Sequence, residues 1–247
     1  MKTTSSPTKV EQVIESIRGL MKNKPFTNNR LPSEPKLARQ LGVSRGTVRQ
    51  AIEHLTRDGL LSRRQGVGTF INENVTGIQT RLEEVWDFDE MIRTSGYKAG
   101  VRHEWLQLGI PEPAAVQALQ LELKDEALTT ANVFLANDIP VIYCIDVIPA
   151  RLVQHAYHED ELHGPVYTFL DKRCGQSVDY NITEVNPVIA DSILSSLLEC
   201  DIGAPLHYFI ETGFNSQDYP IIYSEEYYRP ELFSFKVVRK MVALRKN

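Results

Sequence analysis

The first sixty residues carry apolar positions at helical spacing. From Thr8 onward they recur at steps of three and four residues, which places them along one face of a helix: Val10, Val13, Ile14, Ile17, Leu20 and Met21. This helix is predicted to end near Lys24-Pro25. A second helix is predicted from Ser33, whose hydroxyl can cap the N-terminus, to about Leu41.

A third helix follows across a very tight turn. Gly42 suits the left-handed C-cap of the second helix, and Ser44 is a good N-cap for the third, over residues 45–58. Its buried stripe comprises Val48, Ile52 and Leu55. The N-terminal half of the third helix is therefore predicted to expose polar and basic side chains.

A hairpin is predicted directly after the third helix. Strand-like runs at residues 60–64 and 69–72 flank Gln65-Gly66-Val67-Gly68, whose glycines can adopt the positive φ of a turn. Helix, turn, helix and hairpin together predict a winged helix-turn-helix. Residues 73–80 lack a clear period, so we place a linker there and a domain boundary near residue 77.

The rest of the chain alternates between strand and helix patterns. Polar turns at Asn137-Asp138 and Gln217-Asp218 precede the similar runs IPVIY and YPIIY, which suggests a duplicated hairpin. We predict an α+β domain over 78–247 on a mostly antiparallel sheet. Its strands are predicted at 101–109, 127–136, 141–148, 178–185, 206–215 and 221–228, and its helices near 83–95, 112–120, 151–155, 165–173 and 187–199.

Charge divides the chain at the same point. The net charge is −5, but residues 1–77 hold 13 Lys and Arg against 6 Asp and Glu, whereas residues 78–247 hold 14 against 26. Only the first part can attract a polyanion such as DNA.

Several protein classes are excluded by composition. No apolar run reaches the ~20 residues of a membrane span, and the N-terminus lacks the apolar segment of a signal peptide, so we expect a cytoplasmic protein with no membrane partner. Cys144, Cys174 and Cys200 are too dispersed for a zinc site or a disulfide framework. His155 and His158 lie in a polar loop, so we expect neither a metal nor a cofactor.

The segment LPSEPKLARQLGVSRGTVRQAIEHLTRDGLLSRRQGVGTFI, residues 31–71, resembles the GntR family of winged-helix regulators. The resemblance implies DNA contacts from the second and third helices and from the wing. Arginine can bond guanine bidentately, glutamine can read adenine, and a serine at a helix N-terminus can bind phosphate. The candidate DNA-binding residues are Arg39, Ser44, Arg45, Thr47, Arg49, Gln50 and Gly66.

The second part resembles the UTRA effector domain of the HutC branch, which shares the fold of chorismate lyase. The resemblance rests on IPVIYCIDVIP (139–149), PVYTFLDKRCG (165–175) and YPIIYSEEYYRPELFSFKVV (219–238). It implies a small-molecule effector bound at the centre of the sheet. Members that bind sugar phosphates carry arginine where this chain has Asn132 and Phe134, which disfavours a phosphorylated ligand.

Acidic and aromatic residues dominate the candidate effector site. Carboxylates favour a ligand with hydroxyl or cationic N–H donors. The candidate residues are Asn132, Asp146, Tyr167, Glu184, Tyr223, Glu225 and Tyr227. Strand alternation allows only one of two sets to line the pocket. We favour Tyr223, Glu225 and Tyr227 over Ser224, Glu226 and Tyr228.

These features predict a homodimeric repressor that binds a palindromic operator and is controlled by a metabolite. Relief of repression by the ligand is the expected sign, with activation as the alternative. An enzyme of the lyase fold is the rival from another class, but the sequence shows no nucleophile elbow, P-loop or dinucleotide fingerprint. An architectural DNA-binding protein without an effector is the second rival.

Overall fold

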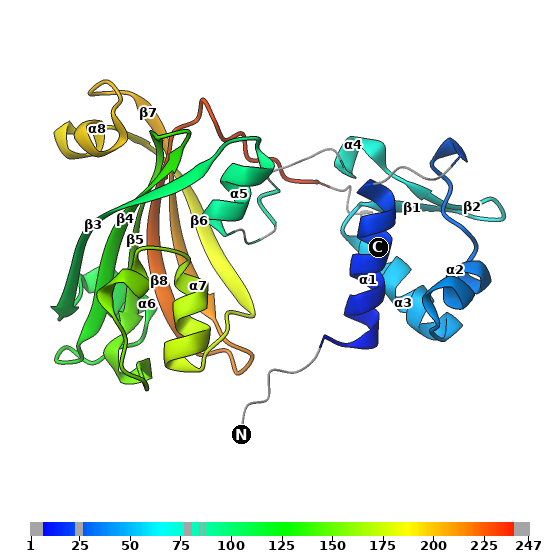
Figure 1. The fold of residues 1–247 in the computed structure, drawn as a ribbon, viewed down its shortest axis with the longest axis horizontal. Coiled ribbons are helices and arrows are strands. Elements are labelled where there is room, and N and C mark those ends of the chain that lie inside the picture. Colours follow the sequence, from blue (N-terminus) through cyan, green and yellow to red (C-terminus); the bar gives the residue numbers. More distant parts are fainter. Residues whose placement is uncertain (1–6, 23–26, 77–80, 84, 86, 240–247) are drawn as a thin grey trace, which may run out of the picture. The chain divides into compact units, whose positions relative to one another are not determined.

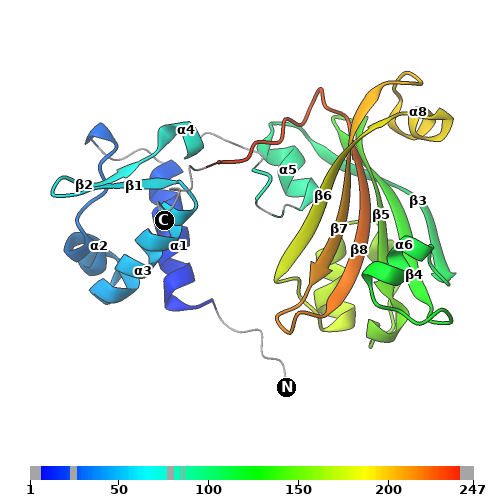
Figure 2. The same ribbon diagram turned by 180° about the vertical axis from the view of Figure 1, so that it is seen from behind.

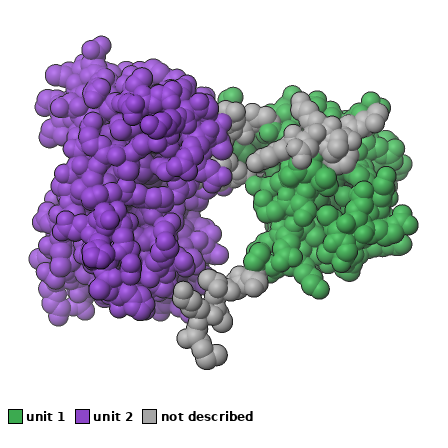
Figure 3. Space-filling view, in the orientation of Figure 1, with its two compact units in different colours: residues 1–81, 236–247 green, residues 82–235 purple. Residues whose placement is uncertain are grey.

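The computed structural model describes residues 7–22, 27–76, 81–83, 85 and 87–239. The chain forms two compact units, Met1–Arg81 with Lys236–Asn247 and Leu82–Phe235 (Figure 3). The predicted boundary at residue 77 lies outside the described residues. The division falls between Arg81 and Leu82, and the end of the chain joins the first unit.

The first unit is a helical core with a hairpin (Figure 1). Its elements are α1 (Lys9–Lys22), the short turn η1 (Thr27–Asn29), α2 (Glu34–Leu41), α3 (Arg45–Arg57), β1 (Leu61–Arg64), β2 (Gly68–Ile71) and α4 (Glu73–Thr76). The antiparallel pairing of β1 and β2 forms the predicted wing. Where a linker was predicted from residue 73, the chain instead forms α4, because Val75 is buried in the core.

The apolar faces of the helices pack together to form the core of this unit. Val13 and Ile17 of α1 pack in one core with Val48, Ile52 and Leu55 of α3, all almost fully buried. Gly42 ends α2 with φ 66° and closes the turn, a conformation that costs glycine little. The tight turn brings α2 and α3 together in a helix-turn-helix.

The second unit is built on one antiparallel sheet of six strands in the order β3-β4-β5-β8-β7-β6. The strands are β3 (Ala99–Gly109), β4 (Ala127–Ala136), β5 (Ile139–Pro149), β6 (Tyr180–Ile189), β7 (Pro205–Phe214) and β8 (Pro220–Tyr228). Two three-stranded meanders meet where β5 pairs with β8. This arrangement agrees with the duplicated hairpin that the two similar runs suggested.

Helices cover both faces of this sheet (Figures 1 and 2). They are α5 (Phe88–Thr94), α6 (Pro113–Ala118), η2 (Ala150–Leu152), η3 (Glu159–Leu162), α7 (Val166–Phe169), η4 (Leu170–Cys174) and α8 (Ser192–Leu198). The predicted helix at 187–199 begins later, because β6 continues to Ile189.

The register divides the strand residues between two faces. Thr130 pairs with Asp146, and Asp146 pairs with Ser224, so their side chains lie on one face, which also carries Asn132 and Glu226. We call it the polar face. It is covered at one end by α5, through Met91 and Ile92 with Phe134, and at the other by η3, α7 and η4.

The opposite face carries Tyr143, Tyr208, Tyr223 and Tyr227, and we call it the tyrosine face. At one end α8 packs against it through Leu194 and Leu198. At the other end α6 packs against it through Ala115 and Leu119. Each face therefore has two covered ends and a middle that carries polar side chains.

Candidate functional site

The N-terminus of α3 presents the side chains that the sequence singled out for DNA. Ser44 caps the helix, its Oγ accepting from the Thr47 amide at 3.1 Å and lying 2.8 Å from Thr47 Oγ1. Arg45, Arg49 and Gln50 are exposed. The first residues of α3 are exposed, and the N–H groups and positive dipole end of a helix N-terminus suit a phosphate group.

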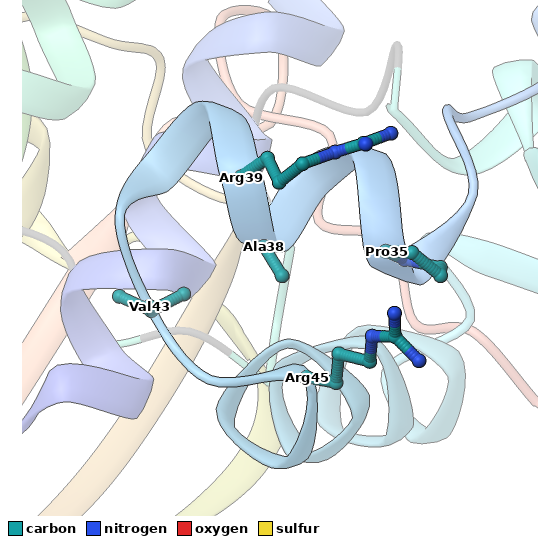
Figure 4. Close-up of a pocket in the computed structure, with 5 residues that line it drawn as sticks. All are labelled: Pro35, Ala38, Arg39, Val43 and Arg45. Carbon is teal, nitrogen blue, oxygen red and sulfur yellow. The ribbon is translucent and has the colours of Figure 1, made fainter.

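A hollow of about 280 Å³ lies between α2 and α3 (Figure 4). Its apolar lining comes from Pro35, Ala38 and Val43. Arg39 of α2 and Arg45 of α3 line it as well. Two guanidinium groups therefore border one apolar recess beside the N-terminus of α3, a combination that suits phosphate oxygens and the sugars between them.

The hairpin supplies the seventh predicted residue. Gly66 adopts φ 72° at the exposed turn, and a methyl group placed on it would meet nothing within 4 Å, so the tip is open to a partner. Gly68 has φ 137° and lies against the Arg30 guanidinium. The guanidinium of Arg64 stacks over the Phe70 ring at 4.3 Å. The stacking of Arg64 on Phe70 thus stabilises the hairpin, whose turn at Gly66 has no side chain.

One feature of this surface was missed by sequence reasoning. Arg49 Nε lies 3.3 Å from Glu53 Oε1, and Glu53 Oε1 lies 3.6 Å from Arg63 Nη1. The spacing of Arg49 and Glu53 by four residues on a helix is the available signal for that pair. The predicted base-reading arginine therefore has an acidic partner on its own helix.

In the second unit, the buried polar side chains gather on the polar face. Asp146 is 4% exposed and accepts from Ser224 Oγ at 2.6 Å. Burial raises its pKa to about 6, opposed by the hydrogen bonds from Ser224 and Cys144. An ionised Asp146 is thus costly in the absence of a compensating donor.

Glu226 and Glu211 add two more carboxylates to the polar face. Glu226 is buried and accepts from the Tyr228 hydroxyl, and burial followed by the nearby Glu211 charge raises its pKa well above the usual value. Glu211 accepts from Thr183 and from Asn181, both at 2.6 Å, and burial raises its pKa as well. Three carboxylates therefore share a poorly solvated surface.

Amide, phenol and imidazole groups border these carboxylates. Asn132 donates to the Leu162 carbonyl at 3.0 Å, and its Oδ1 lies 3.0 Å from His103 Nδ1. His103 stacks on His163 with ring centroids 4.0 Å apart. Asn181 donates to the hydroxyl of the partly buried Tyr167 at 3.3 Å. Asn132, Asp146 and Tyr167 of the predicted effector residues belong to this arrangement.

The other four predicted effector residues lie on the tyrosine face. Glu225 accepts from the hydroxyls of Tyr208 at 2.9 Å, Tyr223 at 3.0 Å and Tyr227 at 3.1 Å. Glu184 pairs with Ile210, and Ile210 pairs with Glu225, so Glu184 and Glu225 lie on the same face of the sheet. The grouping of these four residues with Asp146 is therefore corrected: side chains on opposite faces of one sheet cannot line one pocket.

On the polar face, Ser224 and Glu226 belong to the set that the sequence analysis disfavoured, and Glu211 was missed by sequence reasoning. Alternation separated the two β8 sets, but the set that the sequence analysis favoured, Tyr223, Glu225 and Tyr227, lies on the face opposite Asp146. The choice follows from the pairing of Asp146 with Ser224 across β5 and β8, a contact between residues 78 positions apart. The missing signal is the strand register.

Among the described residues, no three His, Cys, Asp or Glu side chains are grouped so that they could hold a metal ion. Within the same residues, no helix has the length and apolar character needed to span a membrane.

Comparisons with known proteins cover both units. The model of bacterial regulatory proteins of the gntR family matches residues 9–71, and the UTRA domain model matches residues 95–234. The chain is 27% identical over 227 residues to the HTH-type transcriptional repressor NagR of Bacillus subtilis, covering 91% of each chain. It is 30% identical over 180 residues to the histidine utilization repressor of Pseudomonas aeruginosa, covering 72% of this chain and 70% of that protein.

Solved structures show the same fold. YydK of Bacillus subtilis, described as a possible transcriptional regulator, superposes with a TM-score of 0.76 at 16% identity, covering 94% of this chain and all of that one. PhnF of Mycobacterium smegmatis superposes with a TM-score of 0.58 at 21% identity, with the same coverage. Because the UTRA model spans more than half of the residues, the chain belongs to the GntR family of bacterial transcription regulators, in the HutC subfamily that carries a UTRA domain.

Proposed function

We propose that the chain is a cytoplasmic, homodimeric repressor that holds a palindromic operator through α3 and the wing, and releases it when a small metabolite binds the polar face. Its family contains transcription regulators and not enzymes, and NagR and the histidine utilization repressor are named as repressors. The observation that carries the proposal is the coexistence of an exposed basic α3 in one unit with a buried polar face in the other.

On the DNA side, α3 is the element that fits a major groove. Arg45, Arg49 and Gln50 project from its exposed side, where arginine can bond guanine and glutamine can bond adenine. Arg39 and Ser44 lie beside these residues and contact the sugar-phosphate backbone of the DNA. The turn at Gly66 has no side chain, so the wing can approach DNA closely. We assign base readout to α3 and positioning on the duplex to its surroundings.

On the effector side, the chemistry of the polar face describes the ligand. The strand positions of this face hold Asp146, Glu226 and Glu211 but no Lys or Arg. A phosphate would therefore meet carboxylates and no fixed strand cation, whereas hydroxyl and N–H donors would be bonded and would offset the cost of ionising Asp146. We propose an unphosphorylated metabolite rich in such donors.

A polar face of this kind also distinguishes a regulator from an architectural protein. A domain used only to join two copies has no need for the five buried polar residues Thr130, Asn132, Asp146, Ser224 and Glu226 on one face. Buried polar groups cost stability unless they are bonded, so their concentration favours a ligand-binding role.

The tyrosine face supports a homodimer. Between α6 and α8 it carries Trp105, which is 40% exposed, and at its edge Ile182, which is 57% exposed. A second copy related by a two-fold axis would cover these apolar groups and present two copies of α3 to an inverted repeat. Ligand binding would then act on the spacing of the two DNA-binding units, and reversing a 1:99 balance needs about 5.5 kcal/mol of differential affinity.

The test is operator selection from a random duplex pool with the full chain, at two salt concentrations. We expect enrichment of an inverted repeat and a steep salt dependence of its affinity. A small-molecule extract should then release the protein from the selected duplex. Recovery of no preferred sequence would contradict the DNA-binding assignment, whereas a selected duplex that no extract releases would contradict effector control alone.

A further inference from the structure

A chain of ion pairs crosses the DNA-binding surface and joins three of its elements. Arg49 of α3 bonds Glu53 one turn further along the helix, Glu53 approaches Arg63 of β1, and Arg63 Nη2 lies 3.1 Å from Glu34 Oε1 at the start of α2. Recognition helix, wing strand and α2 are thus linked by alternating charges.

The bond to Glu53 uses the part of Arg49 that base recognition does not need. Glu53 accepts from Nε, whereas the four N–H groups on Nη1 and Nη2 provide a fork for the two acceptors of a guanine edge. A long arginine side chain loses rotamer freedom when it binds, and a partner that orders it beforehand lowers that loss.

The charge of Glu53 makes its role testable. A carboxylate on a helix that faces DNA repels every phosphate, whatever the base sequence. A residue that weakens binding to all DNA and also orders a base-reading side chain improves preference at the cost of affinity. Arg63 lies between Glu53 and Glu34, so it braces Glu53 from the wing side.

We propose that Glu53 is the positioning residue for base readout: it holds Arg49 with the Nη fork free for the operator, and Arg63 and Glu34 hold Glu53 in turn. The proposal rests on the proposed function, because it assumes that Arg49 reads a base.

The experiment measures the affinities of full-length protein for the selected operator and for a scrambled duplex of equal length. Glu53→Gln should leave the scrambled affinity unchanged or raise it, while the ratio of operator to scrambled affinity falls by about fivefold or more, a part of the discrimination of one bidentate contact. Glu15→Gln removes the same charge from the exposed side of α1 and should leave the ratio unchanged. A rise of both affinities by the same factor in Glu53→Gln, or no change in either, would overturn the proposal.

Glu53→Asp separates charge from reach. It keeps the carboxylate but is one methylene shorter, so the ratio should fall without a gain in scrambled affinity. Repeated selection should show that Glu53→Gln and Arg49→Ala relax the same operator position, and relaxation of a different position would overturn the proposal. If Arg49→Ala selects the wild-type operator, the base-reading assignment of the proposed function fails instead, and thermal melts of each variant show that the fold is retained.

Discussion

At the scale of residues, the buried carboxylates of the polar face are the strongest signs of function in the second unit. Asp146 and Glu226 are almost fully buried, and each keeps a hydroxyl partner, Ser224 and Tyr228. Burial raises both pKa values, so ionising these carboxyls costs stability, and the hydroxyl or N–H donors of the proposed ligand would offset that cost. In the proposed function, this face gives up stability in order to bind the metabolite.

The pKa of Asp146 predicts a pH dependence of stability. It is raised from 3.8 to about 6 by folding, so the folded state binds more protons than the unfolded state between these values. The contribution of this carboxyl to the free energy of unfolding is fully present below pH ~4 and is lost as the pH rises through ~6. The loss amounts to about 3 kcal/mol. In urea unfolding between pH 4 and 7, the free energy of unfolding of wild type should fall relative to that of Asp146→Asn as the pH rises. A difference independent of pH would contradict the raised pKa.

Residue identity could be predicted on this face only in part. Asp146 and Tyr167 were found because they lie in motifs of the UTRA resemblance, and Asn132 because it stands where family members that bind sugar phosphates carry arginine. Ser224 and Glu226 were set aside, because Glu225 carries the same charge as Glu226 and shares a strand face with Tyr223 and Tyr227, which resemble ligand contacts. The structure shows those two hydroxyls and that of Tyr208 bonded to Glu225 on the other face.

At the scale of elements, local signals placed most helices and strands. Gly42 and Ser44 end one helix and begin the next as their preferences predict, and Asn137-Asp138 turns the β4–β5 hairpin with φ 50° and 66°. The register of the strands could not be predicted from local signals. β5 pairs with β8 although the paired residues are more than seventy positions apart, and a bulge between His103 and Trp105 shifts the alternation of β3.

The Ser44 cap predicts a measurable loss of stability. Ser44→Ala leaves the Thr47 amide without its acceptor and should destabilise the DNA-binding unit by about 1 kcal/mol. Hydrogen exchange of α3 amides in the full chain would report the loss where it occurs. Ser16→Ala is the matched control, because Ser16 Oγ only bonds the Gln12 carbonyl inside α1 and alanine suits a helix interior. Equal protection of α3 in both variants would show that the cap is dispensable.

At the scale of the molecule, the chain passes between the two units twice. It enters the second unit at Leu82 and leaves it after Phe235, and Lys236 then bridges to Arg81. Val238 packs against the core of the first unit. No local pattern predicts this return, because the tail follows the last strand without a period of its own and packs on residues from the beginning of the chain.

The proposed dimer predicts opposite results for two isoleucines of one edge strand. Ile182 and Ile189 of β6 are both exposed, but Ile182 lies on the tyrosine face and Ile189 on the other. Ile182→Glu should shift the protein toward monomers and weaken operator binding, because a charge in an apolar interface is costly. Ile189→Glu should change neither. Sedimentation velocity measures both, and a dimer unaffected by Ile182→Glu would place the interface elsewhere.

Binding of the effector to the polar face is tested most directly by the release of the selected operator. Fluorescence anisotropy at neutral pH measures this release as the small-molecule extract is added. Wild type, Asp146→Asn and Glu184→Gln should bind the operator alike, since all three keep the first unit unchanged. We expect the extract to release wild type and Glu184→Gln but not Asp146→Asn, because only Asp146 lies on the polar face. Release of Asp146→Asn at the wild-type extract concentration, with Glu184→Gln unresponsive, would contradict the assignment and place the effector on the tyrosine face.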